Sequence, residues 1–496
     1  MRLFPVTGGI HPDYRKDGTS EKAIVVMPPT AALYVPLHQH IGAPAEALVK
    51  EGDLVKKGQM IARNQGAVSA TQHAPTSGRV ASVTMVPAPH PSGLPVLTIA
   101  IEPDGKDEWG EAMPSLGDPF ALDTHAINER VAAAGIVGMG GAAFPSAIKL
   151  NLGTQKKLHT LLLNGAECEP YLTCDDRVMR EHAEEIIDGA RIMAHALGAA
   201  NIVVGIEDNK PQAAEIMKKA AAAHSNIEVA VVPVQYPMGS EKHLVQAITG
   251  KETPARMLTA DLGIVVHNVA TARAVHNAVR NGRPLVARVV TVSGGALREP
   301  KNVEVCIGTK ISDLIEFCGG FAQRPERVVN GGPMMGQPLP TLDAPVVKGT
   351  SGILALTAAE ISDKPTSACI RCGACITACP CGLSPVEMSA FIRKDNLEGA
   401  EKIGVRDCIS CGSCSWVCPS HIPLVHYFNY AKGTLNAQDR DKRKTERIAI
   451  LVESRNVRIE KAAEAKKAAL AAKKAAAPAA APAAAAPTTT EEKTNA

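Results

Sequence analysis

The stretch that decides the fold of this chain is CIRCGACITACP, residues 369–380, and CISCGSCSWVCP repeats it at residues 408–419. Each copy has the spacing C-x-x-C-x-x-C-x-x-x-C-P, and every cysteine lies 39 residues from its counterpart. The first three thiolates of a copy can wrap one iron–sulfur cube within a single tight loop. The fourth, on the following turn, points the other way.

This spacing is typical of bacterial two-cluster ferredoxins, in which the fourth cysteine of each motif binds the other cluster. The sequence therefore predicts two 4Fe–4S clusters with crossed ligands. The two sets are Cys369, Cys372, Cys375 and Cys418, and Cys408, Cys411, Cys414 and Cys379. Zinc ribbons use two pairs of cysteines, and disulfides need an oxidising compartment, so neither alternative explains the repeat.

The other possible metal ligands show no such spacing. The chain has 13 cysteines, and a cysteine outside a motif is more often a small buried hydrophobe than a ligand. We expect that role for Cys168, Cys174, Cys306, Cys318 and Cys381. We expect structural or surface roles for His38, His40, His267 and His276.

Length and composition limit the class of protein. The 496 residues suggest about three domains. A net charge of +3 is too near balance for a dedicated nucleic-acid binder, and an aromatic content of 3% leaves few platforms for base stacking. No apolar run reaches the roughly 18 residues of a spanning helix. The start of the chain does not read as a secretory signal, which favours a reducing compartment.

The C-terminal tail differs in kind from the body. Residues 439–474 hold 12 basic and 6 acidic side chains, and their Ala, Lys and Glu content favours a helix. Beyond Lys474 the proline-interrupted, low-complexity run predicts disorder. A basic tail suits either a solvated linker or contact with anionic lipid or an acidic partner.

Glycine-punctuated β patterns fill the N-terminal region, in VKEGDLVKKGQMIA (49–62) and APTSGRVASVTM (74–85). The pattern resembles the barrel-sandwich module of lipoyl and biotinyl carriers, whose hairpin tip carries a modifiable lysine. The corresponding stretch, RNQGAVSATQH (63–73), has no lysine. We therefore expect a docking or structural module.

Helical and strand patterns alternate from residue 125 to residue 281, which predicts an α/β domain with a largely parallel sheet. Strands are expected at 159–163, 201–206, 228–234 and 262–266, and helices at 128–134, 177–197 and 211–223. Further on, strands at 288–292 and 303–306, a helix at 312–318 and a strand at 327–329 predict a small α+β module. Short helices are expected in the cysteine-dense region from residue 364 to about residue 430.

The segment GIVGMGGAAFPSAIKL (135–150) lies between a helix and a proline-started segment. Glycines let a backbone approach a phosphate closely, although a plain turn would need them too. The run into Phe144-Pro145 resembles the flavin loop of the NADH-oxidising, FMN-binding subunit of respiratory complex I. Three later blocks match that family in order: NGAECEP (164–170), the segment 236–254 and VVHNVATA (265–272).

The resemblance has departures. Met139, Ala166, Ser240 and His267 stand where the complex I protein has Arg, Asp, Glu and Asn. That protein also has a single C-terminal cluster. The whole arrangement instead resembles the RnfC/RsxC family, a component of the Rnf (also called Rsx) ion-translocating electron transport complexes, over residues 1–435.

This resemblance implies a peripheral subunit on the cytoplasmic side of the bacterial inner membrane, in a six-subunit-type complex that couples electron transfer to ion movement. It implies non-covalent FMN, exchange of electrons with NAD(H), two 4Fe–4S clusters and membrane association through partners. The alternatives are an iron–sulfur relay without a functional flavin site, or a diaphorase subunit of a soluble oxidoreductase. No catalytic side chain and no nucleic-acid partner are expected.

The resemblance also implies roles for individual residues. Cofactor-binding residues are expected at Gly138, Gly140, Gly141, Lys149, Asn164, Glu167, Gly239, Glu241, Asn268 and Thr271. The three loop glycines and Lys149 would hold the phosphate, and the two asparagines would bind flavin or ribityl groups. Glu167 and Glu241 would line the cavity, or else be ordinary loop carboxylates. Phe144 suits the core as well as a cofactor stack.

The expected architecture is multidomain α/β. It comprises a barrel-sandwich (lipoyl-like) module at 1–115, a Rossmann-like flavin domain at 120–284, a β-grasp (SLBB-like) module at 285–345, a small helical two-cluster ferredoxin-type domain at 360–435 and a basic, then disordered tail at 439–496.

Overall fold

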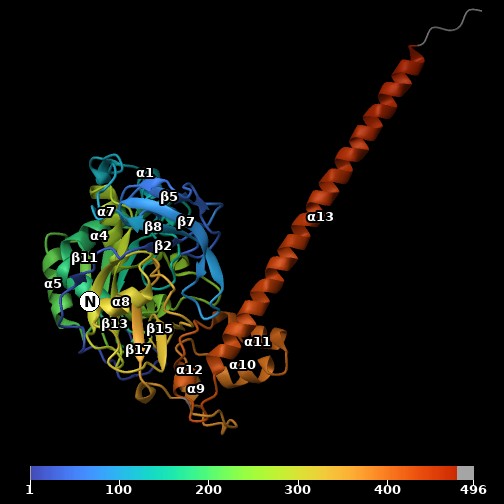
Figure 1. Ribbon diagram of the computed structural model, residues 1–496. Helices are drawn as coiled ribbons and strands as arrows, with labels where there is room; N and C mark the ends of the chain where they lie inside the picture. The colour runs from blue at the N-terminus through green and yellow to red at the C-terminus, as the bar shows by residue number, and fades with distance from the viewer. Residues whose placement is uncertain (1, 363, 477–496) are drawn as a thin grey trace, which may run out of the picture. The chain divides into compact units, whose positions relative to one another are not determined.

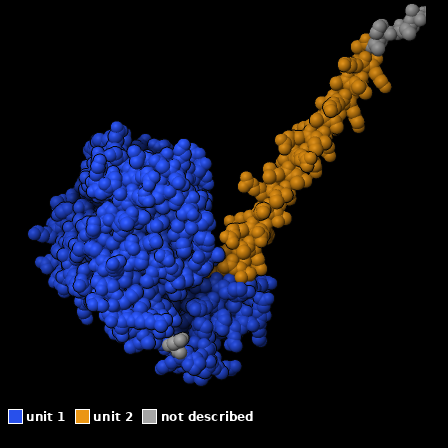
Figure 2. Space-filling view, in the orientation of Figure 1, with its two compact units in different colours: residues 1–431 blue, residues 432–496 orange. Residues whose placement is uncertain are grey.

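The computed structural model describes residues 2–362 and 364–476. The chain forms two compact units, Met1–Ala431 and Lys432–Ala496, which Figure 2 colours separately. The first unit holds all the β-sheets (Figure 1). Along the part of the chain that is described, no helix combines the length and apolarity needed to cross a membrane.

The N-terminal module is a sandwich of two small antiparallel sheets. One has the order β2 (Leu33–Pro36), β8 (Pro95–Pro103), β7 (Gly78–Pro87), β4 (Leu54–Val55), and the other β3 (Glu46–Ala47), β5 (Met60–Arg63), β6 (Gln72–His73). Val35, Val80, Ile99 and Ile101 from the first sheet pack on Ile61 of the second. The expected barrel-sandwich architecture is confirmed.

A four-stranded, wholly parallel sheet forms the centre of the second module. Its order is β11 (Ile227–Val232), β10 (Asn201–Glu207), β9 (Thr160–Gly165), β12 (Ile264–Asn268). Alternate side chains of β9 enter different cores, since Leu161 and Leu163 join one apolar cluster and Leu162 joins another. Both faces of the sheet are therefore covered, as parallel sheets require.

Helices cover both faces, since Ile186 and Val275 join the cluster of Leu161 and Leu163, whereas Leu244 and Ile248 join that of Leu162. The helices of this module are α1 (Thr124–Ala133), α2 (Ser146–Leu150), α3 (Cys174–Glu181), α4 (Ala183–Leu197), α5 (Pro211–Ala221), α6 (Glu241–Thr249) and α7 (Val269–Arg280), with 3₁₀ turns η1 (Pro119–Ala121), η2 (Asn151–Thr154) and η3 (Thr259–Leu262). The single helix expected at 177–197 is wrong. His182 leaves the helical region with φ −134° and ψ 32°, and Glu184 and Glu185 begin a new first turn there.

The β-grasp module is a mixed six-stranded sheet with one helix, α8 (Ile311–Phe317). The strand order is β1 (Val25–Val26), β14 (Lys301–Cys306), β13 (Ala287–Ser293), β17 (Gly352–Leu356), β15 (Arg327–Asn330), β16 (Gln337–Pro338). β1 and β17 lie outside the expected range 285–345. Both pair in parallel with strands distant in sequence, which a local pattern cannot reveal.

The two cysteine motifs fold in the same way. Gly373 and Gly412 both adopt the left-handed backbone conformation, with φ 78° and 82°, and each comes directly before a short helix. Their neighbours Arg371 and Ser410 also match, with φ 56° and 58°. The helices here are α9 (Ala374–Thr377), α10 (Pro385–Ile392), α11 (Leu397–Lys402) and α12 (Ser413–Trp416), with 3₁₀ turns η4 (Ala358–Glu360) and η5 (Val405–Asp407). The sequence repeat is therefore also a structural repeat.

The last element, α13, runs from Leu424 to Ala475. It confirms the helix expected in the basic part of the tail. Within the second unit, large apolar side chains such as Ile450, Leu451 and Leu470 are exposed. The disorder expected beyond Lys474 falls mainly on residues 477–496, outside the described residues.

Close packing of α4 on α7 yields a stability prediction. A Cβ at Gly189 would lie 1.9 Å from the Ala272 carbonyl oxygen. We expect Gly189→Ala to lower the free energy of unfolding by about 1–3 kcal/mol, because backbone cannot move aside as a flexible side chain can. Thermal unfolding followed by circular dichroism measures this. Gly18→Ala is the control, since its Cβ would meet only Pro300, at 3.9 Å. Equal midpoints for the two variants would refute the packing argument.

Candidate functional site

The sheet reverses its direction of growth at β9, and this creates the site. From β9 the chain adds β10 and β11 on one side and then places β12 on the other. Ligands of parallel α/β sheets bind outside the carboxyl ends of the strands at such a switch point. Asn268 is the last residue of β12, Asn164 is the last but one of β9, and the two are register partners. The structure thus brings together two residues expected to bind the cofactor.

The glycine-rich loop lies over this edge. Gly140 and Gly141 line a cavity of about 520 Å³, and a Cβ on Gly141, at φ 101°, would meet nothing within 4 Å. Gly138 instead closes the loop, donating its N–H to the Phe144 carbonyl at 2.8 Å. Thr271 accepts the Met139 N–H at 3.0 Å, so it supports the loop from behind.

Besides Asn268, three more of the expected residues line the same cavity, namely Asn164, Glu167 and Gly239. Asn164 donates to the Gly239 carbonyl at 2.8 Å, which ties two of the recognised blocks together. The Glu167 carboxylate accepts the Asp175 N–H at 2.7 Å and the Asp176 N–H at 3.2 Å, so it caps the start of α3. A role for Glu167 in holding α3 thus accompanies its place in the cavity wall.

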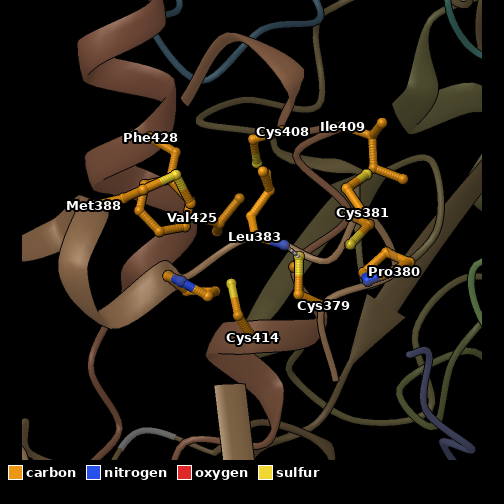
Figure 3. Close-up of a pocket in the computed structure, with 13 residues that line it drawn as sticks. Cys379, Pro380, Cys381, Leu383, Met388, Cys408, Ile409, Cys414, Val425 and Phe428 are labelled. Atoms are coloured by element: carbon orange, nitrogen blue, oxygen red, sulfur yellow. Dashed lines mark hydrogen bonds between the residues drawn. The ribbon is translucent and has the colours of Figure 1, made fainter. Parts of the chain in front are cut away.

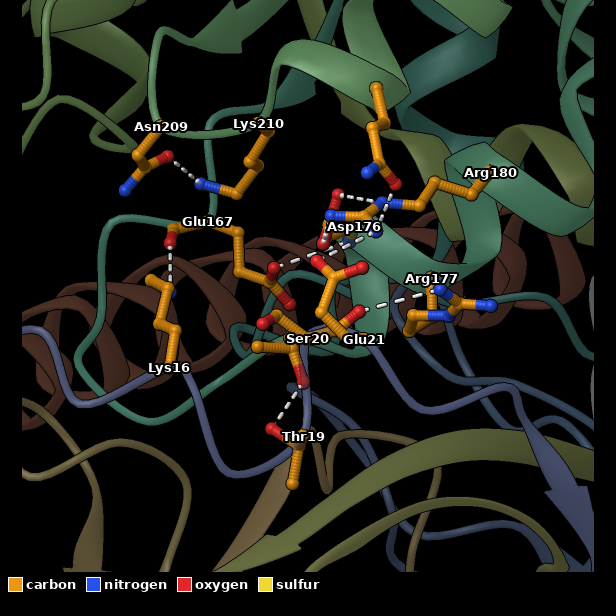
Figure 4. Close-up of polar contacts among 12 residues, drawn as sticks. Lys16, Thr19, Ser20, Glu21, Glu167, Asp176, Arg177, Arg180, Asn209 and Lys210 are labelled. Atoms are coloured by element: carbon orange, nitrogen blue, oxygen red, sulfur yellow. Dashed lines mark hydrogen bonds and ion pairs between the residues drawn. The ribbon is translucent and has the colours of Figure 1, made fainter.

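An N-terminal lysine braces this corner. Lys16 donates to the Glu167 carbonyl at 2.9 Å (Figure 4). It also donates to the carbonyls of Glu169, at 2.9 Å, and Leu172. Burial lowers the pKa of Lys16. Because Lys16 lies outside all the recognised blocks, the sequence patterns did not point to it.

Lys149 and Glu241 lie apart from the cavity. The Lys149 ammonium donates to Glu241 at 2.8 Å and to the Val266 carbonyl at 2.6 Å, and the Thr259 hydroxyl also donates to Glu241. Neither side chain is in the cavity wall. Their pairing joins two of the recognised blocks and leaves the wall without this lysine.

The third wall of the cavity comes from the β-grasp module. Gly331, Gly332 and Gly336 of the loop NGGPMMG line it. Glu169 fastens this loop by accepting the Met334 and Met335 N–H groups at 3.0 and 2.8 Å. The paired glycines in this loop were a signal that could have marked it.

The cavity fits FMN by size and by its walls. Its volume lies within the roughly 300–1,000 Å³ typical of cofactor sites. Seven glycines allow close approach of a flat ring and a phosphate, namely Gly140, Gly141, Gly239, Gly331, Gly332, Gly336 and Gly349. Amide side chains of Asn164 and Asn268 offer hydrogen bonds at the strand ends.

The described cavity wall is acidic and holds no lysine, arginine or histidine. Burial, and next the charge of Glu167, raises the pKa of Asp175 to about 7. Burial also raises the pKa of Glu169 to about 7. The wall therefore gains negative charge as the pH rises through neutrality.

The second cysteine motif surrounds a small cavity together with one cysteine of the first. Cys408, Cys411 and Cys414 line it with Cys379 (Figure 3). Burial, and next the charges of the other three thiols, raise the pKa of Cys414 to about 12. This grouping is the one that crossed ligation requires, and four converging thiols fit a 4Fe–4S cluster.

The remaining thiols group in the same manner. Burial raises the pKa of Cys375, and the thiols of Cys418 and Cys372 raise it further. Cys369 and Cys372 are exposed, whereas Cys411 and Cys414 are buried. Equivalent backbone N–H groups reach the first sulfur of each motif, from Arg371 and from Ser410, both at 3.4 Å.

Two residues connect the flavin cavity to the second thiol group. Ile409 lines both cavities. Tyr236 lines the larger one, and its fully buried hydroxyl donates to the Cys411 carbonyl at 2.6 Å. Cys168 also lines the larger cavity, and it packs with Tyr236, Ile409 and Cys411 in one apolar cluster. The thiol group of the second motif is therefore the one that borders the flavin cavity.

The other residues set aside from ligand roles are mostly buried. Cys168, Cys174, Cys306 and Cys318 are buried, as expected of small hydrophobes. Cys381 lies in the wall of the second thiol cavity, and burial raises its pKa to about 12. His267 is buried, and its pKa is lowered by that burial. His276 pairs with Asp188 at 2.7 Å.

Family models match the chain in four consecutive ranges. Residues 4–106 match the RnfC barrel sandwich hybrid domain, 131–277 the Nuo51 FMN-binding domain, 289–338 the SLBB domain and 361–444 the 4Fe-4S dicluster domain. The fold and the site therefore define a flavin- and iron–sulfur-dependent electron-transfer protein.

Curated relatives make the family specific. The C subunit of the ion-translocating oxidoreductase complex of Rhodobacter capsulatus is 59% identical over 90% of this chain and 85% of its own. The C subunit of a proton-translocating ferredoxin:NAD(+) oxidoreductase complex from Clostridium ljungdahlii is 46% identical over 88% and 95%. The chain belongs to the RnfC family, the C subunits of ion-translocating oxidoreductase complexes.

The raised pKa of the Asp175 carboxylate predicts a pH dependence. Because its pKa is raised, ionisation opposes folding, and this penalty grows as the pH rises from about 4 through about 7. We expect Asp175→Asn, in flavin-free protein, to unfold a few degrees higher than the wild type at pH 8 and to differ less at pH 5. Calorimetry at the two pH values measures this. The exposed Asp17→Asn is the control. A pH-independent effect of Asp175→Asn would contradict the prediction.

The crossed grouping of thiols predicts the result of removing the fourth cysteine. We expect Cys379→Ala to give the EPR spectrum and iron content of Cys411→Ala, in which a cysteine of the second motif is lost. Cys381→Ala, in the same cavity wall, should leave both cluster signals intact. A spectrum for Cys379→Ala that matches Cys372→Ala would show that the crossed assignment is wrong.

Proposed function

We propose that this protein exchanges electrons between NAD(H) and partner subunits of its complex through FMN and two 4Fe–4S clusters. The observation that carries the proposal is the boundary between the two cavities. Ile409 lines both of them, and Tyr236 of the larger cavity contacts Cys411 of the smaller one. This boundary sets a cofactor-sized cavity directly against one group of four thiols. An open, glycine-lined cavity also supports a working flavin site over a pure iron–sulfur relay.

The chain's own residues bind and orient. Gly140 and Gly141 would receive the FMN phosphate, while Asn164 and Asn268 would bind the flavin or ribityl groups. Bound FMN accepts two electrons from a reduced nicotinamide and releases them singly, which suits a site beside an iron–sulfur cluster. Glu169 holds the NGGPMMG loop and so maintains the third wall.

The order of the two thiol groups follows from their positions. The Cys408–Cys414 group, completed by Cys379, borders the flavin cavity, so we assign it as the first acceptor of electrons. The other group, in which Cys369 and Cys372 are exposed and Cys375 and Cys418 are half-buried, would then face the partner subunit. This order applies in reverse when electrons run toward NAD⁺.

The setting in the cell is inferred from the family. We infer a peripheral subunit on the cytoplasmic side of the bacterial inner membrane, attached through the other subunits of a six-subunit-type complex. The name of the Clostridium ljungdahlii relative, which specifies ferredoxin and NAD(+), supports NAD(H) as the substrate of this chain.

A cofactor inventory with anaerobic reduction tests the proposal. The full chain, reconstituted with iron and sulfide, should bind one FMN and about eight irons, as two four-iron clusters require. Addition of NADH should bleach the flavin and cluster absorbance. Clusters without flavin and without an NADH response would refute the proposal and favour an iron–sulfur relay. Recovery in the cytosol without membrane partners would favour a soluble diaphorase.

The order of the thiol groups predicts an asymmetric response to cluster removal. In Cys408→Ala, NADH should still bleach the flavin, but reduction of the remaining cluster should slow at least about tenfold because the nearer relay is missing. In Cys372→Ala, the remaining cluster should be reduced at nearly the wild-type rate. Stopped-flow absorbance under anaerobic conditions measures both. The opposite pattern would reverse the assigned order.

A further inference from the structure

Two buried basic side chains contact the flavin loop without lining the cavity themselves. Arg288 on β13 is 3% exposed, and Lys348, shortly before β17, is 1% exposed. Both belong to the β-grasp sheet or its connections and not to the α/β domain. Neither residue was singled out by the sequence patterns.

The two cations hold opposite ends of one loop segment. Lys348 donates to the Gly135 carbonyl at 2.7 Å, and also to the Thr71 carbonyl of the barrel-sandwich module at 2.7 Å. Arg288 donates to the Met139 carbonyl at 3.4 Å and to the backbone carbonyl of Lys348 itself. The segment Gly135–Met139 is thus gripped at its first and last residues.

Neither cation has an acidic partner within ion-pair distance among residues 2–362 and 364–476. Backbone carbonyls satisfy the donors but do not neutralise the charge, so burial lowers the pKa of Lys348 to about 7 and a nearby anion would favour its charged form. Arg288 is attracted by Asp175 of the cavity wall without a direct ion pair. The flavin cavity presents the opposite problem, because its described wall has three carboxylates and no basic side chain. An anion bound there would need positive charge from outside the wall.

The peptide between Met139 and Gly140 links the two sides. In a trans peptide the C=O and the following N–H point in opposite directions. Arg288 holds the Met139 carbonyl, so the Gly140 N–H is directed away from Arg288, and Gly140 lines the flavin cavity. The grip on the carbonyl therefore orients an N–H donor as well as adding positive charge behind it.

We propose that Arg288 and Lys348 form a two-cation clamp that presents the Gly140–Gly141 backbone to the phosphate of FMN and balances its charge. The β-grasp module is then part of the flavin site and not only a spacer. This inference rests on the proposed function, since it takes FMN as the occupant of the cavity. Arg288 and Lys348 are positioning residues, because both act through the loop.

Comparison of FMN with riboflavin, which lacks the phosphate, tests the clamp. Full-length, cluster-loaded protein freed of flavin is titrated with each compound, and binding is followed by quenching of flavin fluorescence. We expect Arg288→Met to weaken FMN binding at least about tenfold and riboflavin binding less than about threefold. Arg283→Met is the matched control. Arg283 and Arg288 both line a second cavity, separate from the flavin cavity, but Arg283 is exposed and stacks on Trp109.

A second measurement compares the salt dependence of binding. In the wild type, added salt should weaken FMN binding more than riboflavin binding, and Lys348→Met should reduce this difference. Equal losses of FMN and riboflavin affinity in Arg288→Met, or equal effects of Arg288→Met and Arg283→Met, would overturn the clamp alone. Failure of the wild type to bind either flavin would overturn the proposed function, and the clamp with it.

Discussion

Parallel pairing of β9 with β10 on one side and β12 on the other is the constraint on which the rest of the structure depends. This reversal leaves an opening at the carboxyl edge of the sheet, and Asn164 and Asn268 stand at its two sides. The glycine loop, the α3 start capped by Glu167 and the turn bearing Tyr236 all meet there. A sheet that grew in one direction only would have covered this edge with a crossover helix.

The other modules complete what the sheet begins. The β-grasp loop supplies a cavity wall, and the cation pair behind the loop comes from the same module. The N-terminal segment also joins the flavin domain to the cysteine motifs, because Ile10 pairs with Tyr236 while the neighbouring Gly9 donates to the Ala378 carbonyl at 3.0 Å. His243 reinforces that join by pairing with the Pro380 carbonyl at 2.9 Å. The N-terminal segment, the flavin domain and the cysteine motifs are therefore held together where the flavin cavity borders the second thiol group.

Local patterns in the sequence predicted the strands of the parallel sheet and the cysteine groups, because each depends on spacing within a short segment. The cavity-facing asparagines were implied by the family resemblance. Local patterns could not predict β1 or β17, whose partners are distant in the chain. The family resemblance implied that Lys149 holds the phosphate, whereas in the structure it pairs with Glu241, since an ion pair between distant segments of one domain leaves no periodic trace in the sequence. Arg288 and Lys348 were also missed, because the sequence does not distinguish a buried basic residue from one at the surface.

The duplicated motif has a consequence for energetics. Ligand type and loop conformation are the same in both copies, so any difference between the clusters must come from their surroundings. Cys411 and Cys414 are buried, while Cys369 and Cys372 face solvent. Adding an electron increases the negative charge on a cluster, which a buried site disfavours. In the isolated protein, the reduction potential should therefore be lower beside the flavin and higher at the surface, a downhill gradient encoded by burial alone.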